Sequence, residues 1–262
     1  MAASSSTARL LATIPPHLRR QVLRARELAR RRDERSTEGR TLGVAPVDRL
    51  LGGELCGGQM VELVGRSSSG RFSVVLGALA AATARGEASA LVDLGDALDP
   101  QNATALGVDP ARLLWARPAH LKPALQAAEA LIGAGFPLVV LDLGVPPVPG
   151  GRGAEASWRR LARALDERET ILLVASPYRV SGTAARTVLH LDEARPSWIG
   201  RRSTPVLLRH LAGRLELEKL DAAPQPAETT FAFASPASPL CAPPDIARHP
   251  SPPTQPCGSS AC

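Results

Sequence analysis

The sequence predicts an α/β fold: a mostly parallel twisted sheet, helices on both of its faces, and an antiparallel hairpin at its carboxyl end. Strand-like and helix-like segments alternate from about residue 41 to 220, and runs such as 138–141 are apolar on both faces. Strands are expected at 60–64, 88–94, 113–116, 138–142, 170–175 and 187–191, and helices at 71–85, 100–106, 121–134 and 155–167. Segments 205–210 and 214–220 are expected to form the hairpin around Ala212-Gly213.

Composition divides the chain into four parts. Residues 1–16 are expected to be a flexible N-terminus, 17–40 a basic amphipathic helix and linker, and 41–223 the folded core. Residues 224–262 contain ten prolines and few large apolar side chains, which predicts a disordered tail. Phe231 and Phe233 form an isolated aromatic pair within that tail, interpreted either as two stray aromatic residues or as a short partner-docking motif.

The net charge of +6 is confined to the N-terminal part, because residues 1–40 hold ten arginines and four acidic residues. The helix expected at 17–35 has a narrow apolar stripe and an arginine-rich opposite side. The stripe consists of Leu18, Val22, Ala25 and Ala29, and the arginines include Arg19 and Arg24. Three interpretations remain open: a solvated helix resting on the core, a docking arm for a partner protein, or a contact to a phosphate backbone.

Several classes of protein are excluded by simple patterns. The longest apolar stretch lies between Arg71 and Arg85, short of the roughly 18 residues that span a membrane. The first residues lack a signal-peptide pattern. None of the four cysteines has CxxC spacing, so neither a metal site nor a disulfide framework is expected. A cytoplasmic protein without membrane partners is the expectation.

The segment Gly65-Arg66-Ser67-Ser68-Ser69-Gly70-Arg71-Phe72-Ser73 stands between a strand and a helix, where a P-loop belongs. In a P-loop, backbone amides cradle phosphates, a lysine reaches the β- and γ-phosphates, and the next hydroxyl binds Mg²⁺. Here Arg71 and Phe72 take those two positions, and Ser73 lies about 100° further round the helix. Asp142, at a strand end, matches the carboxylate that holds Mg²⁺. These residues are interpreted as a vestigial nucleotide site.

Three pairs of segments resemble the ATPase core of bacterial RecA, and the resemblance extends over about residues 42–195. The pairs are 60–65 with 68–70, 90–93 with 97–100, and 106–109 with 113–114. The resemblance implies a RecA-like P-loop core, but it fails at the catalytic positions. The catalytic glutamate of RecA falls at Gly95, and the glutamine that couples γ-phosphate to DNA falls near Pro177. The neighbouring Asp96 is expected to point to the other side. No ATP hydrolysis, and at most weak ATP or Mg²⁺ binding, is therefore expected.

The two segments that resemble the DNA-binding loops of RecA, 143–157 and 177–186, look shortened. They leave Arg152, Arg179 and Arg186 as candidates for weak DNA contacts.

The short core, altered P-loop, basic helix and Pro-rich tail together resemble the ImuA family, accessory proteins of the bacterial SOS mutasome. That family acts with ImuB, an inactive relative of Y-family polymerases, and with an error-prone C-family polymerase. The resemblance implies a non-catalytic role in SOS-induced translesion synthesis, with RecA or ImuB docking on helix 17–35 and the tail. Phe231 to Ala234 has the Phe-x-x-Ala shape that eukaryotic RecA relatives use for protomer contacts.

Two alternatives remain. One is a weak P-loop ATPase in recombination that uses Arg71, Ser73, Asp142 and a shifted Asp96. The other is a SulA-like cell-division inhibitor, which would bind FtsZ.

Overall fold

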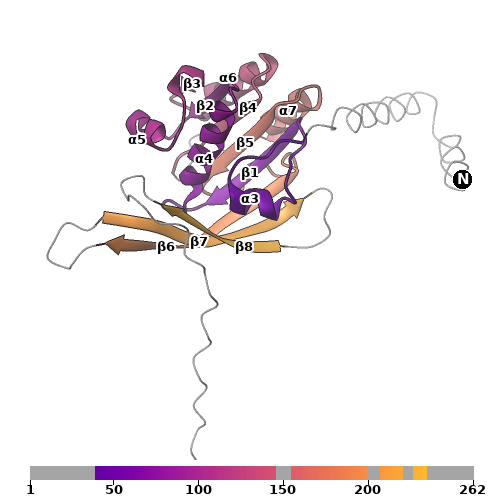
Figure 1. Ribbon diagram of the computed structural model, residues 1–262. Helices are drawn as coiled ribbons and strands as arrows, with labels where there is room; N and C mark the ends of the chain where they lie inside the picture. Colours follow the sequence, from indigo (N-terminus) through magenta and orange to yellow (C-terminus); the bar gives the residue numbers. More distant parts are fainter. Residues whose placement is uncertain (1–38, 146–154, 200–206, 221–226, 235–262) are drawn as a thin grey trace, which may run out of the picture.

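A computed structural model describes residues 39–145, 155–199, 207–220 and 227–234 (Figure 1). The predicted helix at 17–35 with all its stripe residues, Arg152, and residues 235–262 lie outside the described residues. Among the helices that are described, none is both long and apolar enough to cross a membrane.

The core is an eight-stranded sheet in the order β3-β2-β4-β5-β1-β6-β7-β8. The strands are β1 (Gln59–Gly65), β2 (Ser89–Asp93), β3 (Leu113–Ala116), β4 (Leu138–Asp142), β5 (Ile171–Ser176), β6 (Thr187–Ile199), β7 (Leu207–Leu220) and β8 (Ala227–Ala234). β1 to β6 pair in parallel, and β7 and β8 extend the sheet in antiparallel fashion. This arrangement confirms the predicted fold class.

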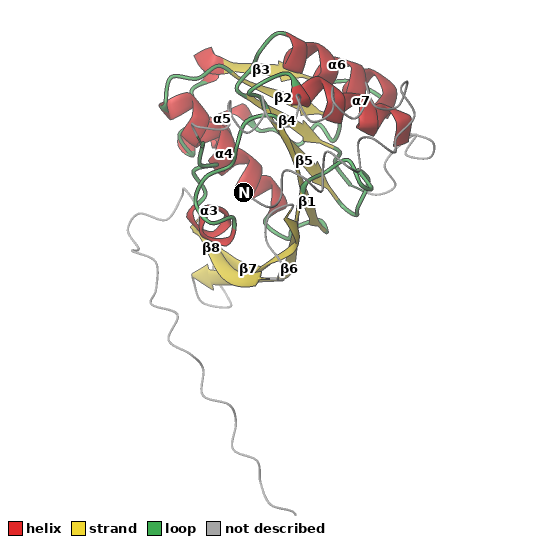
Figure 2. Ribbon diagram, turned by 90° about the vertical axis from the view of Figure 1, so that its right-hand side faces the viewer, coloured by secondary structure: helices red, strands yellow, loops and turns green. Residues whose placement is uncertain are grey.

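Helices cover both faces of the sheet (Figures 1 and 2). One face packs against α3 (Ala45–Leu50), α4 (Arg71–Ala84) and α5 (Pro100–Ala105), and the other against α6 (Leu121–Gly133) and α7 (Glu155–Asp166). α4 is apolar around most of its circumference because it lies buried between the sheet and its neighbours. α7 buries Trp158, Leu161 and Leu165, which its spacing places on one face. A short 3-10 helix at Pro110–Arg112 precedes β3.

Most predicted elements agree with the structure to within two residues, but the predicted hairpin does not. β7 is one strand that runs through Ala212-Gly213, and its hairpin partner is β6, which continues to Ile199. Gly213 suggested a turn at this point of the sequence, but in the structure it makes room for the side chain of Phe231 on β8. A Cβ at Gly213 would come within 2.6 Å of the ring of Phe231.

The prediction of a disordered tail from residue 224 is wrong for residues 227–234, which form β8. Thr229, Phe231 and Phe233 alternate along this strand and share the face that turns toward the body. Phe231 is 2% exposed and belongs to the core, and Phe233 is partly buried against it. The prediction that Phe231 is a partner-docking residue is therefore corrected: it docks on its own chain. The high proline content of 224–262 concealed a proline-free strand.

Candidate functional site

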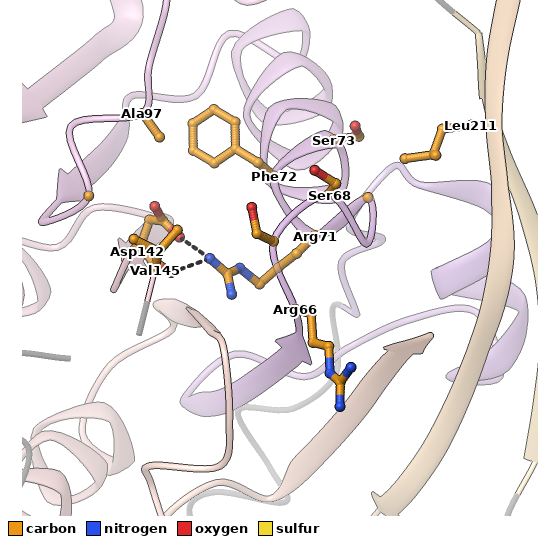
Figure 3. Close-up of a pocket in the computed structure, with 13 residues that line it drawn as sticks. Arg66, Ser68, Arg71, Phe72, Ser73, Ala97, Asp142, Val145 and Leu211 are labelled. Atoms are coloured by element: carbon orange, nitrogen blue, oxygen red, sulfur yellow. Dashed lines mark hydrogen bonds and ion pairs between the residues drawn. The ribbon is translucent and has the colours of Figure 1, made fainter. Parts of the chain in front are cut away.

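A pocket of about 240 Å³ lies at the carboxyl ends of β1, β2 and β4, where parallel sheets commonly bind ligands (Figure 3). Six of the predicted nucleotide-site residues line it: Ser68, Gly70, Arg71, Phe72, Ser73 and Asp142. The other two are Gly65, the last residue of β1, and Ser69, in the loop that follows it. The structure therefore brings the predicted residues together.

The loop after β1 has left-handed backbone at two positions, Ser68 with φ 61° and Gly70 with φ 91°. Glycine adopts such a φ without strain, and it lets the chain turn sharply into α4. The carbonyl of Gly70 then accepts the first helical hydrogen bond, from the amide of Val74 at 3.1 Å. The backbone shape of a P-loop is thus retained.

Arg71 lines the pocket, but its guanidinium is held by groups of the protein itself. Its Nη1 donates to the carbonyl of Gly65 at 2.7 Å, and its Nη2 donates to the carbonyl of Gly144 at 2.6 Å. The same Nη2 lies 3.6 Å from Oδ1 of Asp142 (Figure 3). The guanidinium is buried and points from the start of α4 toward the end of β4. It joins the P-loop after β1 to the end of β4, from which β1 is separated by β5 in the sheet.

Asp142 is 1% exposed, and burial raises the pKa of its carboxyl group to about 6. The guanidinium of Arg71 lowers this pKa, and the nearby carboxylate of Asp93 raises it. Burial in turn lowers the pKa of Arg71, against the opposing effect of Asp142. The two groups therefore compensate each other's charge inside the protein.

Phe72 occupies the position of the Mg²⁺-binding hydroxyl. Its ring lies toward Ala97 at the pocket wall and packs against the hydrophobic core around α4 (Figure 3). Ser73 lines the pocket one position further on. Arg66 also borders the pocket, but its side chain points away from Arg71 (Figure 3).

Backbone closes the space beside Gly95, the position at which the resemblance to RecA places a catalytic glutamate. A Cβ at Gly95 would lie 2.6 Å from Cα of Gly144 and 3.2 Å from Oδ2 of Asp142. Gly144 itself has φ 71°, and a Cβ there would lie 2.7 Å from Cα of Gly95. The ends of β2 and β4 approach so closely that no side chain fits between them without moving backbone.

The two aspartates near β2 serve other contacts. Asp93 accepts hydrogen bonds from the amides of Ala97 and Leu98 and from the indole of Trp115, and so fixes the turn after β2. Asp96 is exposed and pairs with Arg117 at 2.7 Å, which lowers the pKa of Asp96. Asp96 does not line the P-loop pocket. It points away from that pocket, as expected.

Sequence reasoning missed two neighbours of the site. Phe231 packs on the P-loop itself, since a Cβ at Gly70 would come within 2.9 Å of its ring. Leu211 of β7 lines the pocket. Both come from strands more than 130 residues away along the chain, so only the pairing of β7 and β8 with the sheet could reveal them. The sequence signal for β8 is the recurrence of Thr229, Phe231 and Phe233 at every second position, which is typical of a strand.

Glu62 is a buried carboxylate on β1 that sequence reasoning also missed. It accepts hydrogen bonds from the amide of Val180 at 2.6 Å and from the hydroxyl and amide of Ser181. These contacts anchor the loop after β5. That loop carries Arg179, which donates to Glu218 at 2.6 Å and to the carbonyl of Gly182.

Of the three candidate DNA contacts, the structure describes Arg179 and Arg186, and Arg152 lies outside the described residues. Arg179 is already paired with Glu218, and the backbone of Arg186 donates to the carbonyl of Met60. DNA contact by either residue stays a prediction.

Comparison with known proteins gives a consistent picture. Residues 27–150 match the RecA N-terminal domain family. Protein RecA of Picosynechococcus sp. is 38% identical over 108 residues, and Protein RecA of Clostridium acetobutylicum is 41% identical over 109 residues. Each match covers 41% of this chain and 31% of the relative, so the chain spans about a third of the length of these relatives.

A crystal structure of the RadB recombinase superimposes with a TM-score of 0.55 at 15% identity. The match covers 75% of this chain and 96% of that one. The chain thus has a RecA-like fold.

A RecA-like fold implies Mg²⁺-ATP as ligand, and the residues of this pocket do not fit it. The hydroxyl that would ligate Mg²⁺ is replaced by Phe72, and the carboxylate of Asp142, which lines the pocket, lies 3.6 Å from a guanidinium. The glycine contact between Gly95 and Gly144 leaves no room for a carboxylate that would polarise water.

Proposed function

Because the chain carries a RecA N-terminal domain in a RecA-like fold, we propose that it is a non-catalytic accessory protein of SOS-induced, error-prone translesion DNA synthesis. It docks on RecA, on an ImuB-type inactive Y-family polymerase, or on both, and through them acts with an error-prone C-family polymerase. The observation that carries the proposal is the contact between Arg71 and Asp142. These two positions would otherwise serve phosphate and metal.

Arg71 is held in place by strong interactions. Hydrogen bonds of a charged group contribute about 1.5–3 kcal/mol each. Breaking a buried ion pair by removing one partner costs about 3–5 kcal/mol, because the other charge stays behind in the interior. A nucleotide that drew Arg71 toward its phosphates would give up much of its binding free energy to this rearrangement. The pocket therefore favours the closed Arg71–Asp142 arrangement over nucleotide.

Preservation of the fold without its catalytic groups favours a binding role. The eight-stranded sheet is formed and the P-loop turns into α4, while Phe72 and Gly95 stand at two positions that the resemblance to RecA makes functional and a third falls near Pro177. The similarity to RecA proteins supports a place in DNA repair or recombination. The resemblance to the ImuA family supports the narrower setting of SOS mutagenesis.

The test is binding of the purified full-length chain to purified RecA and to the ImuB-type protein, with and without Mg²⁺-ATP. We expect at least one partner to bind with a dissociation constant that nucleotide leaves unchanged. Removal of residues 1–36 is expected to weaken this binding, because those residues hold the predicted docking helix. Binding that requires Mg²⁺-ATP would contradict the proposal, and so would binding to FtsZ but to neither partner.

A further inference from the structure

The free end of the β6–β7 ribbon carries apolar side chains that the fold does not use. We define the ribbon tip as Trp198, Ile199, Leu207, Leu208 and Arg209. Pairing of β6 with β1 ends at Leu191, and pairing of β8 with β7 ends at His210. Beyond those points β6 and β7 pair only with each other among the described strands. Figure 1 shows this end of the ribbon running out from under the central sheet.

Large apolar side chains are unusually exposed at the ribbon tip. Trp198 is 57% exposed, Ile199 45% and Leu207 56%. Among the described residues, the other exposed large hydrophobic side chains are Leu114 on β3, Val145 in the loop after β4 and Tyr178 in the loop after β5. Contiguous exposed apolar surface on a protein marks an interaction site, whereas single exposed side chains need no explanation.

Both faces of the ribbon are apolar at this end. Ile199 lies opposite Leu207, and Trp198 lies opposite Leu208. Opposite residues of an antiparallel pair share a face, and consecutive residues point to opposite faces. A two-stranded ribbon is only marginally stable by itself. Apolar residues on both of its faces therefore suit insertion into a partner, because packing on the rest of this protein would cover one face only.

The charge of the ribbon tip indicates the chemistry of that partner. Arg209 is exposed, and the sequence from 195 to 209 holds four arginines and no acidic residue. Exposed tryptophan and arginine are the residues that most often dominate binding energy at protein interfaces. We propose that the ribbon tip inserts into an apolar groove, flanked by carboxylates, on a second protein.

A protein groove fits this surface better than a nucleic acid does. Single-stranded nucleic acid is bound by aromatic side chains that stack on bases, combined with basic residues. The ribbon tip offers one aromatic ring, Trp198, beside the three aliphatic side chains of Ile199, Leu207 and Leu208. Aliphatic side chains neither stack on bases nor bond to phosphates, but they fill an apolar groove.

This inference rests on the proposed function, because the partner is one of the proteins named there. The experiment measures binding of full-length wild type, Trp198→Ala, Leu207→Ser and Arg209→Glu to purified RecA and the purified ImuB-type protein. Leu114→Ser is the matched control, since Leu114 is 44% exposed on β3 at the far edge of the sheet. Circular dichroism and thermal melting establish that each variant is folded. Binding of each protein to a single-stranded oligonucleotide is measured in parallel.

The expected result is at least a tenfold weaker affinity for one partner in all three ribbon variants, with Leu114→Ser unchanged. The wild-type complex is also expected to weaken as salt rises, because the arginines face carboxylates. Wild-type affinity in every ribbon variant would overturn this inference and leave the proposed function standing. Wild type that binds neither protein would overturn both. Ribbon variants that lose oligonucleotide binding but keep partner binding would assign the surface to nucleic acid instead.

Discussion

Arg71, the first residue of α4, lies 3.6 Å from the carboxylate of Asp142, the last residue of β4. Both side chains line the pocket that a P-loop fold would offer to phosphate and metal. Each side chain is buried and needs the other for charge compensation. The pair therefore connects the stability of the protein to the closure of its nucleotide site.

Removal of one member of this pair is expected to cost more than removal of both. Arg71→Met leaves the carboxylate of Asp142 buried without a cation, and the free energy of unfolding should fall by about 3–5 kcal/mol. Arg71→Met/Asp142→Leu removes both charges and should recover much of that loss. Urea unfolding of the two variants and wild type measures the difference. A double variant as unstable as the single one would show that the pair is not the stabilising unit.

The stability of the protein should depend on pH through Asp142. Its folded-state pKa, about 6, is above the value of about 3.9 in an unfolded chain. The folded state therefore holds this proton more tightly, and the contribution of Asp142 to stability is present below about pH 4 and lost as pH rises through about 6. Each unit of pKa difference is worth about 1.4 kcal/mol, so the loss amounts to about 3 kcal/mol.

Asp142→Asn removes this titration and is the matched control for it. The free energy of unfolding of wild type should fall between pH 4 and pH 7 relative to that of Asp142→Asn. Parallel curves for the two proteins over that interval would contradict the raised pKa.

The core of the fold follows from sequence because its elements are locally distinct. Leu138–Asp142 is apolar throughout, which suits a central parallel strand, and α7 repeats apolar residues at helical spacing. β8 could not be found in the same way. Its eight residues are stabilised by pairing with β7 and by burial of Phe231, and both contacts depend on residues distant in the chain.

Phe231 is expected to be a core residue of the protein. Phe231→Ala would leave a cavity between Gly70 and Gly213, both of which lack a side chain to fill it. Such a truncation typically costs about 3–5 kcal/mol. Phe233→Ala, at a partly buried position on the same strand face, should cost less and serves as the control. Equal stability of Phe231→Ala and wild type would mean that β8 does not stabilise the fold.

The residues of the P-loop pocket could be predicted from the sequence, but their contacts could not, because these contacts also involve distant parts of the chain. The residues of the P-loop and Asp142 were identified because the motif is local and the strand end is clear. Which groups Arg71 contacts could not be predicted, because the carbonyl of Gly144 and the carboxylate of Asp142 reach it from another strand. The approach of Gly95 to Gly144 likewise depends on the pairing of β2 with β4.

Gly95 should not tolerate any side chain. Its Cβ would lie 2.6 Å from Cα of Gly144, and overpacking of this kind costs about 1–3 kcal/mol. Gly95→Ala is therefore expected to lower the melting temperature. Gly95→Glu should lower it further without producing phosphate release from ATP, although it restores a carboxylate at the catalytic position. Gly133→Ala is the control, because nothing lies within 4 Å of a Cβ at Gly133. ATP hydrolysis by Gly95→Glu would show that this carboxylate was the one missing group.

Calorimetric titration of the full-length chain with Mg²⁺-ATP tests the central claim most directly. With Arg71 and Asp142 compensating each other and Phe72 in place of a metal ligand, we predict no binding tighter than about 1 mM, which corresponds to about −4.1 kcal/mol. A micromolar dissociation constant that is lost in Asp142→Ala would contradict that claim and identify the protein as a nucleotide-binding RecA relative.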